Sequence, residues 1–242
     1  MDKKKKITIA VVAVIIAAAV AAAVFAIVRH QQVSARNAVN TEVAMINDLI
    51  NEEYTENINR DELNEILQRR VSSGKYGDVE DAFKNYMTEL YTIVYDATDA
   101  ANDDAFNTFL SPENMENDGP AFETSKETAN ELITRLETDK ENYEQMLTAE
   151  AIDSYAQRAG LSGKYKEMYD EITSANKTTG EADESEFTSS IDTTIAQLAG
   201  INDVFDFLEE NQNNWYMQDG KLTFRTETLY NDYNSLIQEL SA

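Results

Sequence analysis

The 242-residue sequence contains no cysteine and a single histidine, His30. Without cysteine, the chain has no thiol nucleophile, disulfide, cysteine-ligated zinc or iron–sulfur site, or lipid-modified cysteine. His30 lies beside a long apolar run, so the remainder of the chain has no imidazole for a Ser-His-Asp triad or a histidine metal cluster. We therefore expect no catalytic residue, no metal site and no cofactor.

Positive charge is also scarce. The chain has 20 Lys and Arg against 45 Asp and Glu, a net charge of -25. Four of the lysines and one aspartate fall in the first 28 residues, which leaves 16 basic against 44 acidic side chains on residues 29–242. So negative a surface repels a phosphate backbone, so we expect no nucleic acid partner. It also predicts, at most, weak association with divalent cations.

Polar residues are missing from one long segment, Ile7–Val28, in which Thr8 is the only polar side chain. As a helix this segment rises roughly 33 Å, which matches a hydrocarbon core of about 30 Å. The sequence therefore predicts a single transmembrane helix with membrane lipid around it. The residues that we assign to this anchor are Ile7, Val11, Ile15, Val20, Phe25 and Val28.

The orientation of the anchor follows from the basic residues before it, namely Lys3, Lys4, Lys5 and Lys6. Because positive charge is retained in the cytoplasm, residues 1–6 are predicted to be cytoplasmic and the C-terminal domain extracellular. The alternative is secretion after cleavage near Ala35, since Val33-Ser34-Ala35 has the small residues that a signal peptidase requires. The apolar run exceeds the usual ~7–15 residues of a signal core, so we favour an uncleaved anchor in the cell membrane.

Glycine and proline number only 8 and 2, and all lie after residue 72, where the apolar pattern breaks. This is typical of helix ends and turns. We predict a mainly α fold, in which the transmembrane helix is followed by a helical stalk at 29–53 and an extracytoplasmic acidic helical bundle at 54–242. Helices are expected near 60–71, 78–110, 125–147, 149–159, 164–176, 187–198, 204–208 and 227–240, with loops at 72–77, 111–124 and 177–185.

The period of the pattern changes at residues 214–225. Two alternating segments flank Asp219-Gly220, a strong signal for a two-residue β-hairpin turn. With this turn, Trp215 and Phe224 share one apolar face, which must pack on helices because an isolated hairpin is barely stable. We therefore expect Trp215 to fill the hairpin core rather than to bind a ligand.

Carboxylates are the abundant groups with catalytic potential, so the enzyme worth testing is a two-carboxylate hydrolase of polysaccharide. Its acids would have to lie in a cleft beside aromatic rings. The acidic runs Glu137/Asp139/Glu141 and Glu209/Glu210 are instead typical of solvated helix faces. The pair Ser125-Lys126 is adjacent along a predicted helix, where neighbours do not face one another.

Two features suggest binding rather than catalysis. The loop 114–119 resembles the first half of an EF-hand, but Pro120 follows the glycine and Ser125 occupies the position of the bidentate glutamate. We therefore predict no specific calcium site there. Tyr165 and Tyr169 are spaced as one stripe of a short helix and, together with Tyr155, form a possible interaction surface if they are exposed. Core packing is the competing interpretation.

These observations predict a non-enzymatic, single-pass bacterial envelope protein whose exported helical domain binds another protein or a cell-wall component. One alternative is a carboxylate-dependent hydrolase acting on cell-wall polysaccharide. The other is a ligand-binding module that works with a membrane transporter, which would require an apolar pocket of several hundred cubic ångströms.

Overall fold

The computed structural model describes residues 34–52, 60–179 and 186–240. The predicted cytoplasmic lysines Lys3–Lys6 and the predicted span Ile7–Val28 lie outside these residues. Within the described ranges, no helix combines the length and the apolar character needed to cross a membrane.

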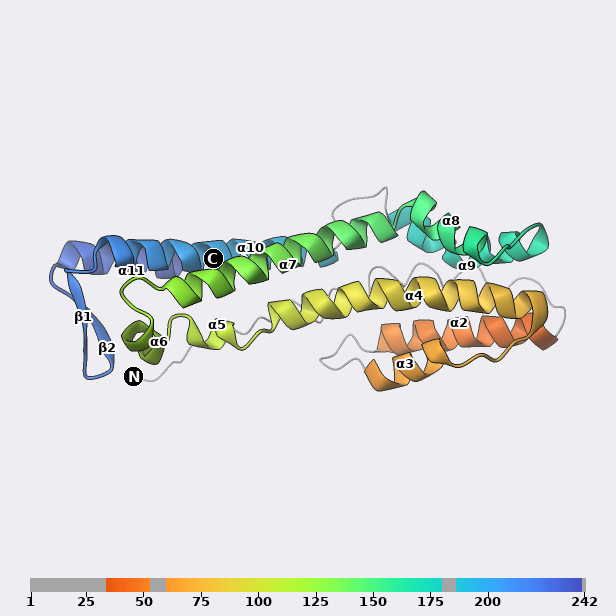
Figure 1. The fold of residues 1–242 in the computed structure, drawn as a ribbon, viewed down its shortest axis with the longest axis horizontal. Helices are drawn as coiled ribbons and strands as arrows, with labels where there is room; N and C mark the ends of the chain where they lie inside the picture. Colours follow the sequence, from red (N-terminus) through yellow and green to blue (C-terminus); the bar gives the residue numbers. More distant parts are fainter. Residues whose placement is uncertain (1–33, 53–59, 180–185, 241–242) are drawn as a thin grey trace. The chain divides into compact units, whose positions relative to one another are not determined.

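The described chain is mainly α-helical with one small antiparallel hairpin (Figure 1), as the sequence predicts. It divides into two compact units, and each is described separately. The elements are α2 (Ser34–Glu52), α3 (Arg60–Gln68), α4 (Gly74–Ala101), α5 (Ala105–Thr108), α6 (Pro112–Asn117), α7 (Glu123–Met146), α8 (Ala149–Arg158), α9 (Lys164–Thr179), α10 (Glu186–Glu210), β1 (Trp215–Gln218), β2 (Lys221–Phe224) and α11 (Glu227–Glu239).

The first unit contains described residues 97–138 and 191–240, and aromatic rings fill its core. Phe122 stacks on Phe205 with ring centres 4.8 Å apart, and Phe109 meets the same ring edge to face at 6.0 Å. Trp215 stacks on Phe122 at 6.2 Å, and its Nε1 donates a hydrogen bond to the Leu208 carbonyl at 2.7 Å. The indole therefore ties the hairpin to α10, as expected of a core tryptophan.

The hairpin has the predicted register. Trp215 pairs with Phe224 and Met217 with Leu222, so these four side chains share one face. Asp219 and Gly220 have φ values of 51° and 67°, the left-handed pair that a two-residue turn with this twist requires. The apolar face lies against helices, because the Phe224 ring contacts Phe207 of α10 and Tyr233 of α11.

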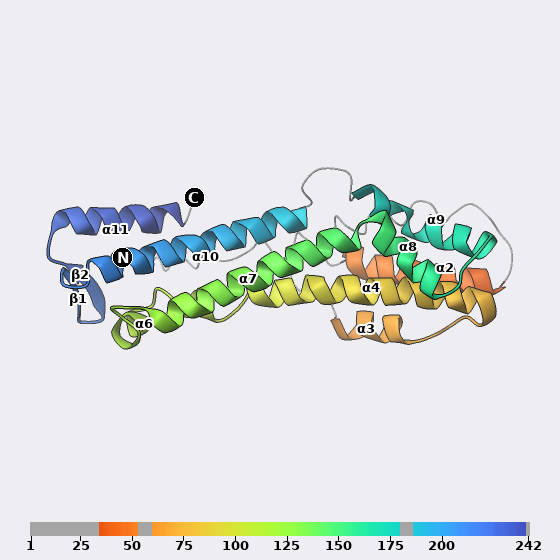
Figure 2. The same cartoon turned by 45° about the horizontal axis from the view of Figure 1, so that its top comes forward.

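The second unit contains described residues 34–52, 60–96, 139–179 and 186–190. Helices α2 and α3 run alongside α4 in both views (Figures 1 and 2). Val39, Val43 and Ile46 recur on one face of α2 and are at most 1% exposed. The burial of these side chains makes α2 part of the core of this unit.

Several predicted helix boundaries are wrong. We expected a break near Gly200, but α10 is one helix from Glu186 to Glu210. The glycine serves packing instead, because a Cβ at Gly200 would lie 2.5 Å from Cδ2 of Leu240 at the end of α11. We also expected a helix from Asp78 to Leu110, whereas α4 begins at Gly74 and ends at Ala101.

The predicted loop 111–124 contains the short helix α6. The Ser111 side chain caps this helix by accepting a hydrogen bond from the Asn114 amide, and Pro112 occupies the first turn. A proline is favourable there because its missing N–H has no helical partner. Sequence reasoning treated Pro112 as a loop residue and so missed this helix start.

Candidate functional site: a groove between α4 and α8

The predicted tyrosine surface needs correction. Tyr165 is part-exposed, but Tyr155 is only 4% exposed and Tyr169 is fully buried. The hydroxyl group of Tyr169 donates to the Ile152 carbonyl at 2.9 Å, which satisfies it inside the second unit. The ring of Tyr169 therefore packs in the core. Tyr155, Tyr165 and Tyr169 do not form one exposed stripe.

Tyr155 nevertheless forms part of a groove on the second unit. The groove has a volume of about 380 Å³ and lies between the N-terminal half of α4 and α8. Carboxylates, an amide and a hydroxyl line its α4 side. The lining residues are Asp78, Asp81, Ala82, Asn85, Thr88 and Glu89 of α4, with Tyr155, Arg158 and Ala159 from α8 and its C-terminal end.

A three-residue contact joins the two sides of the groove. The Tyr155 hydroxyl donates a short hydrogen bond to Oε2 of Glu89. The Arg158 guanidinium lies over the Tyr155 ring, with its central carbon 3.9 Å from the ring centre. Burial and the Glu89 carboxylate together raise the pKa of Tyr155 to about 12, so the phenol stays protonated at neutral pH. The contact therefore holds Glu89 in place as an acceptor.

The start of α4 carries the other charged groups of the groove. Arg70 lies 3.5 Å from an Asp78 carboxylate oxygen and 3.3 Å from one of Asp81, and Lys75 lies 3.1 Å from Asp78. These pairs are exposed to solvent and each contributes at most about 1 kcal/mol. They leave the groove with a mixed polar surface rather than an isolated acidic one.

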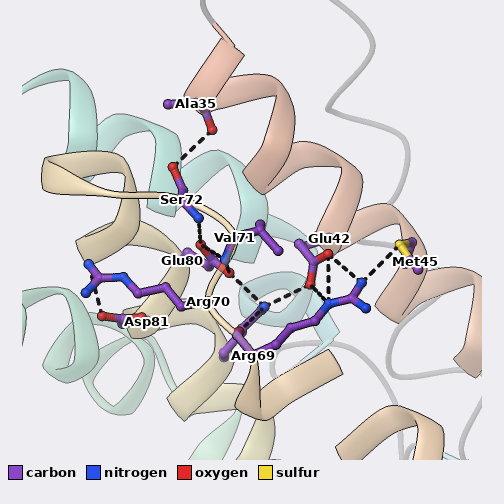
Figure 3. A network of polar contacts seen from close by, with 10 residues as sticks. Ala35, Glu42, Met45, Arg69, Arg70, Val71, Ser72, Glu80 and Asp81 are labelled. Atoms are coloured by element: carbon purple, nitrogen blue, oxygen red, sulfur yellow. Dashed lines mark hydrogen bonds and ion pairs between the residues drawn. The ribbon is translucent and has the colours of Figure 1, made fainter. Parts of the chain in front are cut away.

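A buried ionic cluster underlies the loop before α4 (Figure 3). The Lys84 ammonium donates to Glu42 at 2.9 Å, to Glu80 at 2.8 Å and to the Arg69 carbonyl at 2.7 Å. The side chains of Lys84, Glu42 and Glu80 are at most 6% exposed. Lys84 of α4 thereby connects α2 to the end of α3.

The two carboxylates of the cluster are fully engaged. Glu80 accepts hydrogen bonds from the backbone amides of Val71 and Ser72, at 2.9 and 2.8 Å. Glu42 accepts hydrogen bonds from Nε and Nη2 of the Arg69 guanidinium, the shortest at 2.6 Å. Burial alone would raise the pKa of Glu42, but the hydrogen bonds from Arg69 and Lys84 outweigh it and lower the pKa below its ordinary value.

Such an arrangement is structural. Buried charges are tolerated only when partners satisfy them, and here each carboxylate has several. Sequence reasoning missed the cluster, although Glu80 and Lys84 have the i, i+4 spacing of a helical ion pair. That spacing is usual on exposed faces, and nothing local indicates that α2 and the α3–α4 loop cover this face.

The EF-hand-like loop has another role. The Asp118 carboxylate accepts hydrogen bonds from the Ser125 amide at 2.8 Å, the Ser125 hydroxyl at 2.6 Å and the Thr124 amide at 3.2 Å. Although burial acts to raise it, these hydrogen bonds lower the pKa of Asp118. The Asp118 carboxylate therefore stabilises the first turn of α7 by accepting these hydrogen bonds. The described residues contain no group of three or more His, Asp or Glu side chains placed to hold a metal ion.

The acidic runs singled out from the sequence are separate from the groove. Glu137, Glu141, Glu209 and Glu210 are exposed, whereas Asp139 is only 8% exposed. None of them lines the groove.

Comparison of the chain with protein-family models, with curated proteins and with solved structures found no match.

Proposed function

We propose that the chain is a non-enzymatic, single-pass membrane protein of a bacterial envelope, whose exported helical domain binds another protein or a cell-wall component. The apolar run Ile7–Val28 behind four lysines supports the anchor and its direction. The partner contact is proposed to lie in the groove between α4 and α8.

The position of Ala35 supports an anchor that is kept. Ala35 lies in the first turn of α2, and its carbonyl accepts a hydrogen bond from the Ser72 hydroxyl at 3.3 Å. The next residue, Arg36, pairs with Glu171 of α9 at 3.2 Å. A peptidase would have to open this first turn before cutting near Ala35.

The observation that supports binding is that the carboxylates of the groove are held by hydrogen bonds and ion pairs. One of these carboxylates, Glu89, accepts a hydrogen bond from the Tyr155 hydroxyl, and Asp78 and Asp81 lie beside basic side chains. Carboxylates fixed in place as hydrogen-bond acceptors, with the Arg158 guanidinium over the Tyr155 ring, are suited to binding a polar partner.

Site-specific cross-linking in intact cells tests this proposal. A photoreactive amino acid at Asn85, which lines the groove, should give one defined adduct with a protein or with wall glycan. The matched control is the same amino acid at Glu65, an exposed position of α3 in the same unit that does not line the groove. No adduct at Asn85, or the same adducts at both positions, would contradict the proposed site.

The hydrolase remains a second candidate because the groove brings carboxylates of α4 next to the Tyr155 ring. In that case the exported domain should release reducing ends from purified cell-wall polysaccharide, and Glu89→Gln should abolish the release. The transporter-linked module is the third candidate. The groove is large enough for a small ligand, and its charged side chains suit a ligand that carries polar groups.

A further inference from the structure

Basic residues of this acidic chain are concentrated in three segments of the second unit. Residues 34–41, 66–77 and 154–166 contain seven Lys and Arg and no Asp or Glu. Residues 29–242 as a whole have only 16 basic side chains against 44 acidic ones, so segments of this kind are unusual in the chain. The seven basic residues are Arg36, Arg69, Arg70, Lys75, Arg158, Lys164 and Lys166.

The fold brings the three segments together. Ser72, just before α4, donates a hydrogen bond from its hydroxyl to the Ala35 carbonyl in the first turn of α2, at 3.3 Å. Tyr76 in the first turn of α4 meets Tyr165 in the first turn of α9, with ring centres 5.1 Å apart. Figures 1 and 2 show the start of α2, the start of α4 and the turn between α8 and α9 at the same end of the unit. We call the surface formed there by the three segments the basic end.

In each of the four helices that begin or finish at the basic end, the charged residue nearest the end is basic. The first acidic residue lies three to six residues further into the same helix, or roughly 5–9 Å deeper at about 1.5 Å per residue. An anionic surface that meets this end therefore meets positive charge first. The four basic residues are Arg36 of α2, Lys75 of α4, Arg158 of α8 and Lys164 of α9.

Two of these charges have no carboxylate partner within the described residues. The Arg158 guanidinium carbon lies 3.9 Å from the Tyr155 ring centre, and the Lys164 ammonium lies 5.1 Å from that of Tyr165. Both side chains are exposed, so both are available to an anionic partner. The other five basic residues of the three segments pair with carboxylates of the same unit, namely Arg36, Arg69, Arg70, Lys75 and Lys166.

The length of the chain before α2 indicates what lies opposite the basic end. This step rests on the proposed anchor, Ile7–Val28. Only residues 29–33 separate Val28 from Ser34, so α2 begins at most about 22 Å from the end of the anchor. α4, with 28 residues, extends about 42 Å away from the basic end. The basic end is therefore the end of the unit that the anchor holds at the membrane.

We propose that the basic end docks on anionic phospholipid headgroups at the exported face of the membrane. Lys75, Arg158 and Lys164 would contact lipid phosphates, and the half-buried rings of Tyr76 and Tyr165 suit the headgroup layer, where tyrosine is enriched. The acidic remainder of the domain is repelled by the same surface, which favours this orientation. A soluble polyanion is the poorer occupant, because the anchor already holds lipid headgroups beside this end.

Fluorescence quenching in the full chain tests this contact. Because the chain has no cysteine, Ser162→Cys in the turn between α8 and α9 takes a single fluorophore. Thr92→Cys is the matched control, since Thr92 is an exposed position of α4 about 27 Å from Gly74. The proteins are reconstituted in vesicles with a nitroxide on some lipid headgroups. The vesicles are either phosphatidylcholine alone or equal parts phosphatidylcholine and phosphatidylglycerol.

The label at Ser162→Cys should be strongly quenched in the vesicles that contain phosphatidylglycerol and weakly quenched in phosphatidylcholine alone. The label at Thr92→Cys should be weakly quenched in both. Equal quenching at the two positions would overturn the proposal. Equal quenching of Ser162→Cys in the two kinds of vesicle would also overturn it, because anionic headgroups would then contribute nothing.

Charge reversal locates the contact. Lys75→Glu combined with Lys164→Glu should lower the ratio of docked to undocked domain by at least about tenfold, since each basic residue near an anionic surface contributes roughly fivefold. Both lysines lie in the first turn of a helix, where an acidic side chain is favourable, so the fold should be kept, which circular dichroism checks. The control, Arg135→Glu with Lys221→Glu, makes the same charge change at exposed positions of the first unit. An equal loss of quenching in both variants would overturn the proposal.

Flotation of the vesicles separates this inference from the proposed function. Salt at about 1 M shortens the Debye length to about 3 Å, so it should abolish the quenching and leave the protein on the floating vesicles. Protein that floats but is not quenched at low salt would overturn the docking and leave the anchor standing. Protein that does not float would overturn both. Neither lysine lines the α4–α8 groove, so cross-linking at Asn85 tests the groove independently.

Discussion

Lys84 is the residue on which the second unit's polar core depends. Its ammonium separates two buried carboxylates that would otherwise face each other without a cation between them. We expect Lys84→Met to lower the free energy of unfolding by roughly 3–5 kcal/mol, because one partner of a buried ion pair is removed. Urea denaturation followed by circular dichroism measures the change.

The control for Lys84→Met is Lys221→Met at the exposed start of β2, which should change stability by no more than about 0.5 kcal/mol. Adding Glu80→Gln to Lys84→Met should restore part of the lost stability, since the uncompensated charge is reduced. If the two lysine variants were equally stable, the cluster would not contribute as the burial of its members indicates.

The lowered pKa of Glu42 should make the stability of the second unit depend on pH. Its pKa is lowered in the folded protein, so the ionised form stabilises the fold above the unfolded value of about 4.3. This contribution is lost as the pH falls through the lower folded pKa. Glu42→Gln should therefore be less stable than the wild type at pH 7, and the difference in free energy of unfolding between the two proteins should become smaller near pH 3. Urea denaturation at both pH values measures this difference. A difference of the same size at pH 7 and pH 3 would contradict this assignment.

At the scale of elements, sequence reasoning succeeded where local chemistry decides the structure. The hairpin register follows from Asp219-Gly220 and the alternation around it, and α11 begins where Thr226 provides a cap, accepting a hydrogen bond from the Leu229 amide. Sequence reasoning failed where the role of a residue depends on a segment that is distant along the chain. Gly200 is a packing residue only because Leu240 of α11 lies against it. The groove likewise needs α4 and α8, 66 residues apart at the Glu89–Tyr155 contact.

Alanine substitutions at two glycines should differ in their effect on stability. A Cβ at Gly119 would lie 2.5 Å from the backbone oxygen of Met115, which cannot move away cheaply. We expect Gly119→Ala to destabilise the first unit by about 1–3 kcal/mol. At Gly200 the nearest atom is the end of the Leu240 side chain, which can rotate, and alanine favours the helix by up to about 1 kcal/mol.

The single tryptophan makes this comparison straightforward, because Trp215 lies in the same unit as both glycines. Its fluorescence during urea denaturation should show the loss for Gly119→Ala and little change for Gly200→Ala. A larger loss for Gly200→Ala would mean that Leu240 is held more rigidly than a terminal side chain should be.

For the whole molecule, the composition predicts a response to salt. At a net charge of -25, self-repulsion opposes the compact state. Raising the salt from about 0.01 M to about 0.15 M shortens the Debye length from about 30 Å to about 8 Å. We expect the Tm to rise by several degrees over this range. An unchanged Tm would show that the acidic side chains repel one another little in the folded protein.

The central claim at this scale is that the acidic domain lies outside the membrane, anchored by Ile7–Val28. The absence of cysteine allows a direct measurement with single-cysteine variants and a membrane-impermeant maleimide. Gln157→Cys, on the exposed face of α8, should be labelled in intact cells and found in the membrane fraction, whereas Lys4→Cys should react only after permeabilisation. Labelling of Gln157→Cys only after permeabilisation would contradict the account.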